Sequence, residues 1–166
     1  MAFNSFIDHV KDESLSCTTT VPEFTPGVKT AKNGFEYCYV YNAAVNSKIL
    51  TGQFVLPDLN NGTSSTSGFS VSVTLATSNT GALMAGVAQQ TFLTGTYGWI
   101  MTKGVSLIAL DVGEISMDAG DKLGLGVNGG FVSSPVTAST GARFGYMINS
   151  GITAATGKGR IVNCVF

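Results

Sequence analysis

Charged side chains are scarce in this sequence, at 11 % of the 166 residues against about 25 % in an average soluble domain. The 9 basic and 10 acidic residues leave a formal net charge of −1. Nucleic acids and anionic membranes are bound through clusters of positive charge, so neither is an expected partner. Hydroxyl groups and glycine supply the polarity instead, because 19 threonines, 16 serines and 21 glycines make up roughly a third of the chain.

Cysteine and histidine are also rare, with three cysteines and one histidine in the whole chain. Cys17, Cys38 and Cys164 lie far apart and show no C-x-x-C spacing, which argues against a redox pair or a zinc site. We expect buried free thiols in a reducing compartment. The single His9 provides neither a histidine pair for a metal nor a conventional catalytic triad, so no metal or other cofactor is expected.

Long hydrophobic runs are absent from the sequence. No apolar stretch approaches the roughly 20 residues that span a bilayer, and no signal-type stretch follows Met1. We therefore expect synthesis in the cytoplasm and no membrane partner. A chain of this length can bury about 70 % of the surface that it exposes when unfolded, which is enough for a core without disulfide or metal cross-links.

Two glycine-rich strings are similar to nucleotide-binding loops but fail on spacing or context. Residues 124–129 satisfy G-x-G-x-x-G, yet no helical period follows them. In residues 151–159, five residues rather than four separate Gly151 from Gly157, and Gly159 replaces the hydroxyl residue that would hold magnesium. We interpret the first string as a hairpin and the second as a loop before the last strand.

Four acidic residues fall within eleven positions and could in principle hold calcium: Asp111, Glu114, Asp118 and Asp121. They do not follow the spacing of a calcium-binding loop, so turns between strands explain them better. The sequence also assembles no combination of nucleophile, general base and oxyanion site. We therefore do not expect an enzyme.

The start of the chain differs from the rest, because residues 1–36 hold 8 of the 19 charged side chains. Apolar residues at the i, i+3, i+4, i+7 spacing predict a short amphipathic helix near residues 5–14. They are Phe3, Phe6, Ile7 and Val10. Two prolines and several β-branched residues favour an extended path over residues 16–27. We therefore expect an N-terminal arm, residues 1–34, and a β domain, residues 35–166.

From residue 35 onward the pattern changes to the period of two that is typical of strands. Residues 35–41 alternate aromatic with other side chains, and residues 69–75 alternate apolar with hydroxyl side chains. Further strands are expected over residues 49–56, 85–91, 97–102, 105–112, 122–127, 143–148 and 160–166. Turn sequences stand at residues 33–34, 61–62, 118–121 and 128–129. The pattern predicts an all-β fold, a jelly-roll-like sandwich or barrel.

Three stretches resemble the small β-rich decoration proteins of bacteriophage heads, also called cement or head-stabilising proteins. They are residues 35–42, residues 85–88 leading to residues 95–100, and residues 102–104 together with residues 119–121. The strings G-x-Y-G-W-I and A-G-D carry most of the likeness.

The resemblance implies a structural virion protein that binds the outside of an assembled phage capsid and bridges neighbouring capsid subunits. The implied partners are the major capsid protein and further copies of the chain, as a homotrimer on the capsid. The implied location is the capsid exterior, after synthesis in the cytoplasm of the bacterial host.

The arm is the part that we expect to reach a neighbour. About 20 extended residues span roughly 65 Å, whereas the remaining domain has an expected radius of gyration near 14 Å. The residues expected at the protein interface are Phe3, Phe6, Ile7, Val10 and Phe24, together with Tyr97 and Trp99. The alternative is that the arm folds back on its own domain.

A lectin-like or receptor-binding β module of a phage tail or spike is the competing function. Residues 97–99 hold the only tryptophan, and an exposed aromatic side chain can stack on a sugar ring or anchor an interface. A tryptophan in such a module is more often half-buried in the core.

Overall fold

The computed structural model describes residues 18–43, 48–58, 72–75, 84–111, 117–126, 129–132, 144–149 and 156–161. Over these residues the fold is all-β, with ten strands and no helix, as predicted from the sequence. No helix in the described part of the chain is long and apolar enough to cross a membrane. The expected helix near residues 5–14 lies outside the described residues.

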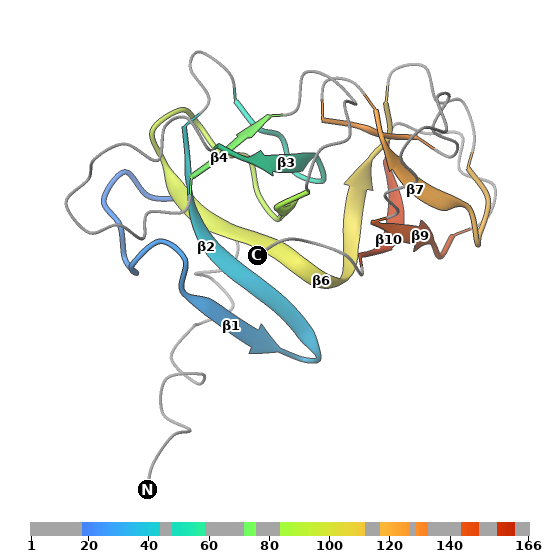
Figure 1. Cartoon of the computed structure of the whole chain (residues 1–166), viewed down its shortest axis with the longest axis horizontal. Helices are drawn as coiled ribbons and strands as arrows, with labels where there is room; N and C mark the ends of the chain where they lie inside the picture. The colour runs from blue at the N-terminus through green and yellow to red at the C-terminus, as the bar shows by residue number, and fades with distance from the viewer. Residues whose placement is uncertain are drawn as a thin grey trace, which may run out of the picture.

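Five strands pair in a closed ring (Figure 1). In ring order they are β2 (Phe35–Asn42), β4 (Ser72–Leu75), β3 (Phe54–Pro57), β5 (Gly86–Ala88) and β6 (Tyr97–Ala109), which pairs with β2 again. The β2–β4 pair is parallel and the other four pairs are antiparallel. Closure leaves the ring without a free edge that could pair with another chain.

The far half of β6 starts a second ring. Its antiparallel neighbours in order are β10 (Thr156–Ile161), β9 (Gly145–Met147), β7 (Lys122–Leu125) and β8 (Phe131–Val132). A parallel bridge between Leu110 and Phe131 returns β8 to the end of β6. The closed pairing is that of a barrel, one of the two architectures predicted from the sequence. A jelly-roll strand order is not confirmed.

Strand β6 joins the two rings, because its first half pairs with β2 and β5 and its second half with β10. The sequence predicted two strands with a break near Gly104, but the strand continues through this residue. Gly104 has a φ of 138° and marks the change of partner from β2 to β10. A glycine here lets the strand bend sharply without ending (Figure 1).

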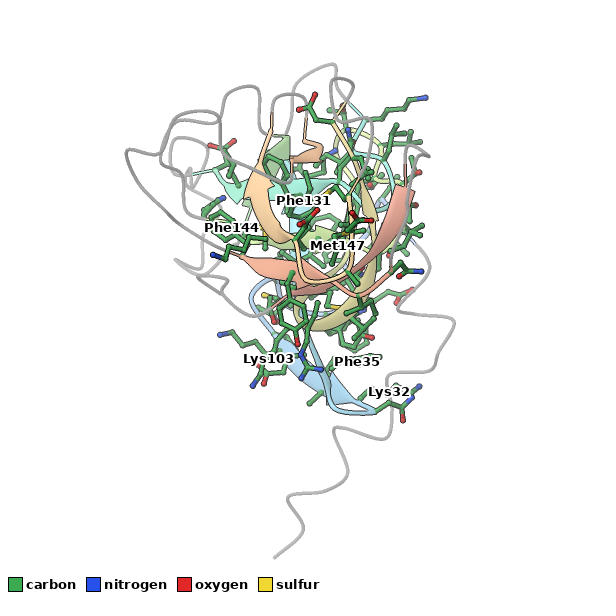
Figure 2. All side chains as sticks on the ribbon, turned by 90° about the vertical axis from the view of Figure 1, so that its right-hand side faces the viewer. Lys32, Phe35, Lys103, Phe131, Phe144 and Met147 are labelled. Atoms are coloured by element: carbon green, nitrogen blue, oxygen red, sulfur yellow. The ribbon has the colours of Figure 1, made fainter. Side chains whose placement is uncertain are left out.

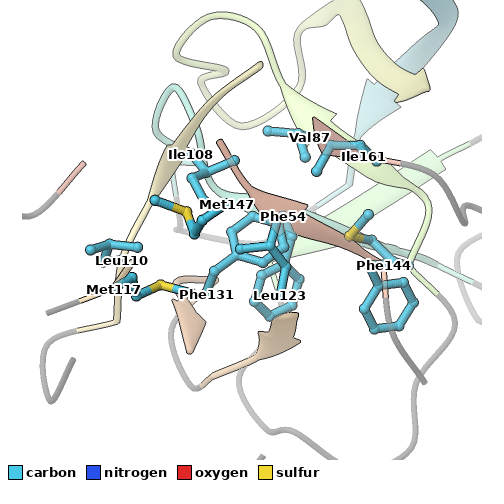
Figure 3. Close-up of a cluster of buried hydrophobic side chains, with 11 residues drawn as sticks. Phe54, Val87, Ile108, Leu110, Met117, Leu123, Phe131, Phe144, Met147 and Ile161 are labelled. Atoms are coloured by element: carbon cyan, nitrogen blue, oxygen red, sulfur yellow. The ribbon is translucent and has the colours of Figure 1, made fainter. Parts of the chain in front are cut away.

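Each ring encloses a separate cluster of buried side chains. The first ring holds eight of them, which are Cys38, Val40, Ile49, Val55, Ala85, Ala88, Phe92 and Ile100. The second ring encloses a larger cluster, which includes Phe131, Phe144 and Met147 (Figure 2). Phe54 comes from β3 of the first ring but packs edge-on against Phe131 at 5.3 Å (Figure 3), so the two rings share apolar contacts as well as a strand.

The short strand β1 (Lys29–Lys32) pairs antiparallel with β2. Asn33 and Gly34 form the turn between them with φ angles of 52° and 79°, as expected for an Asn-Gly hairpin. The domain boundary expected between residues 34 and 35 therefore falls at the end of this turn, and Lys29–Lys32 belongs to the sheet.

Two further expectations about strands were wrong. The strand predicted over residues 49–56 is interrupted by a turn at residues 51–52, where Gly52 has a φ of 83° and lies against the backbone of β6. The glycine-rich stretch expected as a loop before the last strand instead forms β10 from Thr156 onward. Gly159 faces the interior there, and a β-carbon at this position would meet Leu123 and Ile108. The packing of the core therefore leaves room only for glycine.

Candidate functional site

An aromatic cluster covers the outer surface of β2 and the first half of β6. Its buried members are Tyr37, Tyr39, Trp99 and Met101, and its partly buried members are Phe24, Val28, Phe35 and Tyr97. The period of two explains the arrangement, since the alternate residues Cys38 and Val40 face the ring interior. Tyr37 and Tyr39 lie opposite Met101 and Trp99 in the β2–β6 register, so cross-strand pairs build the cluster.

A segment that we call the strap, residues 18–28, lies over this cluster. At its start, Thr19 and Tyr97 exchange two backbone hydrogen bonds, with N–O distances of 3.0 and 2.7 Å. At its end, Gly27 N–H donates to the Tyr39 carbonyl at 2.7 Å, and Tyr39 N–H donates to the Val28 carbonyl at 2.9 Å. In the middle, the backbone N–H of Glu23 donates to the Tyr39 hydroxyl at 3.1 Å. The strap is therefore held to the domain along its length.

Phe24 is the apolar anchor of the strap. Its ring centroid lies 5.3 Å from that of Tyr39 and 5.4 Å from that of Trp99, and Tyr39 and Trp99 are themselves 5.1 Å apart. These edge-on and tilted arrangements are the favoured geometries of aromatic pairs. For this residue the structure shows the fold-back alternative, because Phe24 packs on its own domain rather than projecting from it.

Tyr97 and Trp99 occupy different environments. Tyr97 is partly exposed and has its ring 4.9 Å from that of Tyr41 and 6.2 Å from that of Tyr39. Trp99 is fully buried beneath the strap and presents no ring face for a sugar or a partner protein. Its place in the predicted interface would therefore require the strap to leave the cluster. Its indole Nε1 is buried and has no hydrogen-bond partner among the described residues.

The other residues predicted for the interface lie outside the described part of the chain. They are Phe3, Phe6, Ile7 and Val10. The strap begins at residue 18, so it is the route by which the first 17 residues connect to the domain. Their role at an interface stays a prediction.

Sequence reasoning missed a second surface, the outer side of the sheet in the second ring. Val105, Arg160, Tyr146 and Lys122 lie in one cross-strand row over β6, β10, β9 and β7. We call this surface, together with Leu107 and Ile148, the basic apolar face. Its apolar members Leu107, Tyr146 and Ile148 are 45 %, 41 % and 41 % exposed. The strands are too short for the period of two to reveal this face before their pairing is known.

Two cations of the basic apolar face, Lys122 and Arg160, are exposed. No ion pair joins either of them to another residue in the described ranges. By contrast, Lys103 pairs with Glu36 across β6 and β2 with an Nζ–Oε1 distance of 3.1 Å. In the part of the chain that the structure describes, the face thus combines three exposed apolar side chains with two positive charges that form no ion pair.

Cys38 is a buried free thiol on the inner side of β2. Burial raises its pKa from 9.0 to about 11, and the positive charge of Lys29 opposes this shift in part. Because the thiolate is the reactive form, this side chain is unreactive near neutral pH.

The described acidic residues considered for calcium, Asp111, Asp118 and Asp121, do not gather around a common point. Asp118 and Asp121 close the turn predicted from the sequence, where the Asp118 N–H donates to the Asp121 carboxylate at 2.8 Å. Asp111 is buried two residues after the end of β6, against Gly126 and Gly130. Across the described ranges, no three His, Cys, Asp or Glu residues could hold a metal together. Glu114 lies outside those ranges.

Comparison with known proteins finds a likeness in fold. No protein family model and no curated protein sequence matches the chain. Among solved structures, the chain is similar to the N base of head fiber gp8.5 in bacteriophage phi29, with a TM-score of 0.53 and 15 % sequence identity. The match covers 78 % of this chain and 97 % of that chain. At this identity the likeness shows a shared fold.

Proposed function

We propose that this protein is a non-enzymatic structural component of a phage virion, a decoration protein that binds the outside of the assembled capsid and bridges neighbouring capsid subunits. The observation that supports this proposal is the fold shared with the N base of a phage head fiber over most of both chains. The resemblance of residues 35–42 and 95–100 to head decoration proteins points to the same class of protein.

The proposed partners are the major capsid protein and further copies of the same chain, as a homotrimer on the capsid surface. Many copies that each add a modest contact would hold the shell together, since multivalent attachment multiplies weak interfaces. The low charge and the hydroxyl-rich composition suit an outer coat that does not attract nucleic acid.

Binding of the fluorescently labelled chain to particles of the phage that carries it, prepared without the chain, tests the proposal. We expect saturable co-sedimentation, with density on the outside of the shell by cryo-electron microscopy. A matched control uses the same particles already saturated with unlabelled chain. Absence of binding, or density inside the shell, would contradict the proposal.

The contribution of the arm is tested best by removing residues 1–17 alone. A longer deletion to residue 26 would also remove Phe24 and most of the strap, and would expose Trp99. A loss of binding in that longer variant would then report on unfolding of the aromatic cluster as much as on a lost contact. We expect the shorter deletion to leave Trp99 fluorescence unchanged and to lower capsid occupancy.

A further inference from the structure

We propose that the basic apolar face of one copy binds the N-terminal segment, residues 1–17, of a neighbouring copy. The inference deepens the self-association included in the proposed function, and it names both sides of the contact. It rests on the composition of the face and on the complementary composition of the segment.

The face needs a partner that is apolar and negatively charged. Leu107, Tyr146 and Ile148 leave apolar surface open to water, and each is 41 % exposed or more. Lys122 and Arg160 flank Tyr146 in the cross-strand row. An interface that buries apolar groups at its centre and pairs charges at its rim fits this arrangement.

The first 17 residues have the complementary composition. They hold three acidic side chains, Asp8, Asp12 and Glu13, against the single Lys11. Their apolar residues recur at the spacing of an amphipathic helix, and such a helix is marginal in water until its apolar side is covered. The segment therefore combines three of the ten acidic residues of the chain with apolar side chains that require a surface to pack against.

The segment joins the domain at the first ring, whereas the face lies on the second. Thr19, near the start of the strap, pairs with Tyr97 at the first end of β6. Leu107 lies ten residues further along this strand, beyond the bend at Gly104, and Tyr146 lies two strands beyond β6.

The proposal commits to a neighbouring copy because that occupant accounts for the self-association included in the proposed function. Exchange of the segment between copies would bring its three carboxylates to Lys122 and Arg160 on the face.

A carbodiimide cross-linker tests the contact directly, because it joins a carboxylate to a lysine amine in contact with it. Full-length chains labelled with 14N and 15N are mixed in equal amounts, cross-linked and digested for mass spectrometry. We expect peptide pairs of mixed isotope that join Lys122 to Asp8, Asp12 or Glu13. Pairs of a single isotope only would show docking on the same chain and would overturn the proposal, as would the absence of pairs to Lys122.

Surface variants of the full chain distinguish a specific contact from nonspecific association. Arg160→Glu and Leu107→Ser should each lower the yield of the mixed pairs several-fold. Lys48→Glu and Leu93→Ser are the matched controls, because both residues are exposed and lie next to the Ile49–Phe92 bridge, away from the second ring. They should leave the yield unchanged. Equal losses in all four variants would overturn the proposal.

Charge exchange provides a rescue. The change Asp12→Lys, added to Arg160→Glu in the same chain, should restore part of the association measured by sedimentation velocity, while Trp99 fluorescence reports that the fold is retained. The contact would be contradicted if Arg160→Glu left the association unchanged and the added Asp12→Lys had no effect on it. No capsid is present in these experiments, so their failure can be told from failure of the proposed capsid binding.

Discussion

Gly104 lies at the point where β6 passes from the first ring to the second, and two separate features restrict this position to glycine. Its φ of 138° is rarely adopted by other residues, and a β-carbon would meet the ring of Phe35 at 2.6 Å. Gly34 also has a positive φ, but a β-carbon there would meet nothing within 4 Å. Alanine substitutions at the two glycines therefore distinguish the cost of backbone strain from the cost of steric overlap.

Gly104→Ala should destabilise the protein more than Gly34→Ala. We expect a loss of about 1 kcal/mol for Gly34→Ala from backbone strain alone, and of at least about 2 kcal/mol for Gly104→Ala, where overlap with Phe35 is added. Urea unfolding followed by Trp99 fluorescence measures both. Equal losses would show that the Phe35 ring moves aside without cost.

Cys38 should make the stability of the protein depend on pH in the alkaline range. Its native pKa of about 11 exceeds the ordinary value of 9.0, so the native state keeps its proton while the unfolded chain releases one. The contribution is complete below pH 9 and is lost as the pH rises towards 11, by about 2–3 kcal/mol in total.

The comparison of the wild type with Cys38→Ala isolates this contribution from other titrating groups. We expect the difference in unfolding free energy between the two proteins to shrink between pH 8.5 and pH 10.5. A difference that is constant with pH would show that burial does not hold the thiol protonated.

At the scale of elements, the strap covers the aromatic cluster on the outer surface of the first ring. Its backbone hydrogen bonds to Tyr39 and Tyr97 hold it in place, and Phe24 fills the space above Tyr39 and Trp99. Val21 belongs to the same segment but is 72 % exposed, so it provides a matched control for the packing of Phe24.

Phe24→Ala should loosen the strap, while Val21→Ala should not. Loss of the partly buried ring is expected to cost about 2 kcal/mol and to shift the fluorescence emission of Trp99, the only tryptophan, to longer wavelength. Limited proteolysis should then cut within residues 18–28 faster than in the wild type. Unchanged emission in Phe24→Ala would mean that other side chains keep Trp99 buried.

At the scale of the whole molecule, the shared strand predicts that both rings unfold together. Hydrogen bonds from β6 reach β2 and β5 in the first ring and β10 in the second, and Phe54 packs on Phe131 between them. Such shared contacts favour one cooperative transition.

Leu123→Ala, a change in the second ring, should therefore lower the midpoint that Trp99 reports in the first. Leu123 is fully buried, so a loss of about 2–5 kcal/mol is expected. Urea transitions by Trp99 fluorescence and by circular dichroism should coincide in the wild type and in the variant. An early transition in circular dichroism that Trp99 does not follow would show that the rings unfold separately.

The sequence by itself determined the fold class and the strongest local elements. The alternation over residues 35–41 assigned β2 and its two faces, and Asn33 and Gly34 predicted their hairpin, because side-chain period and turn chemistry are local properties. The resemblance to head decoration proteins also rested on local strings, and the N base of a phage head fiber shares the fold at 15 % sequence identity.

Only the tertiary structure decided where the surfaces lie. Trp99 is buried and Phe24 packs on its own domain, because the strap crosses a cluster built by residues 15 and 75 positions away from Phe24 in the sequence. The basic apolar face depends on the register of four strands whose residues are scattered from position 105 to position 160. Long-range pairing sets both features, and no local pattern of side chains encodes it.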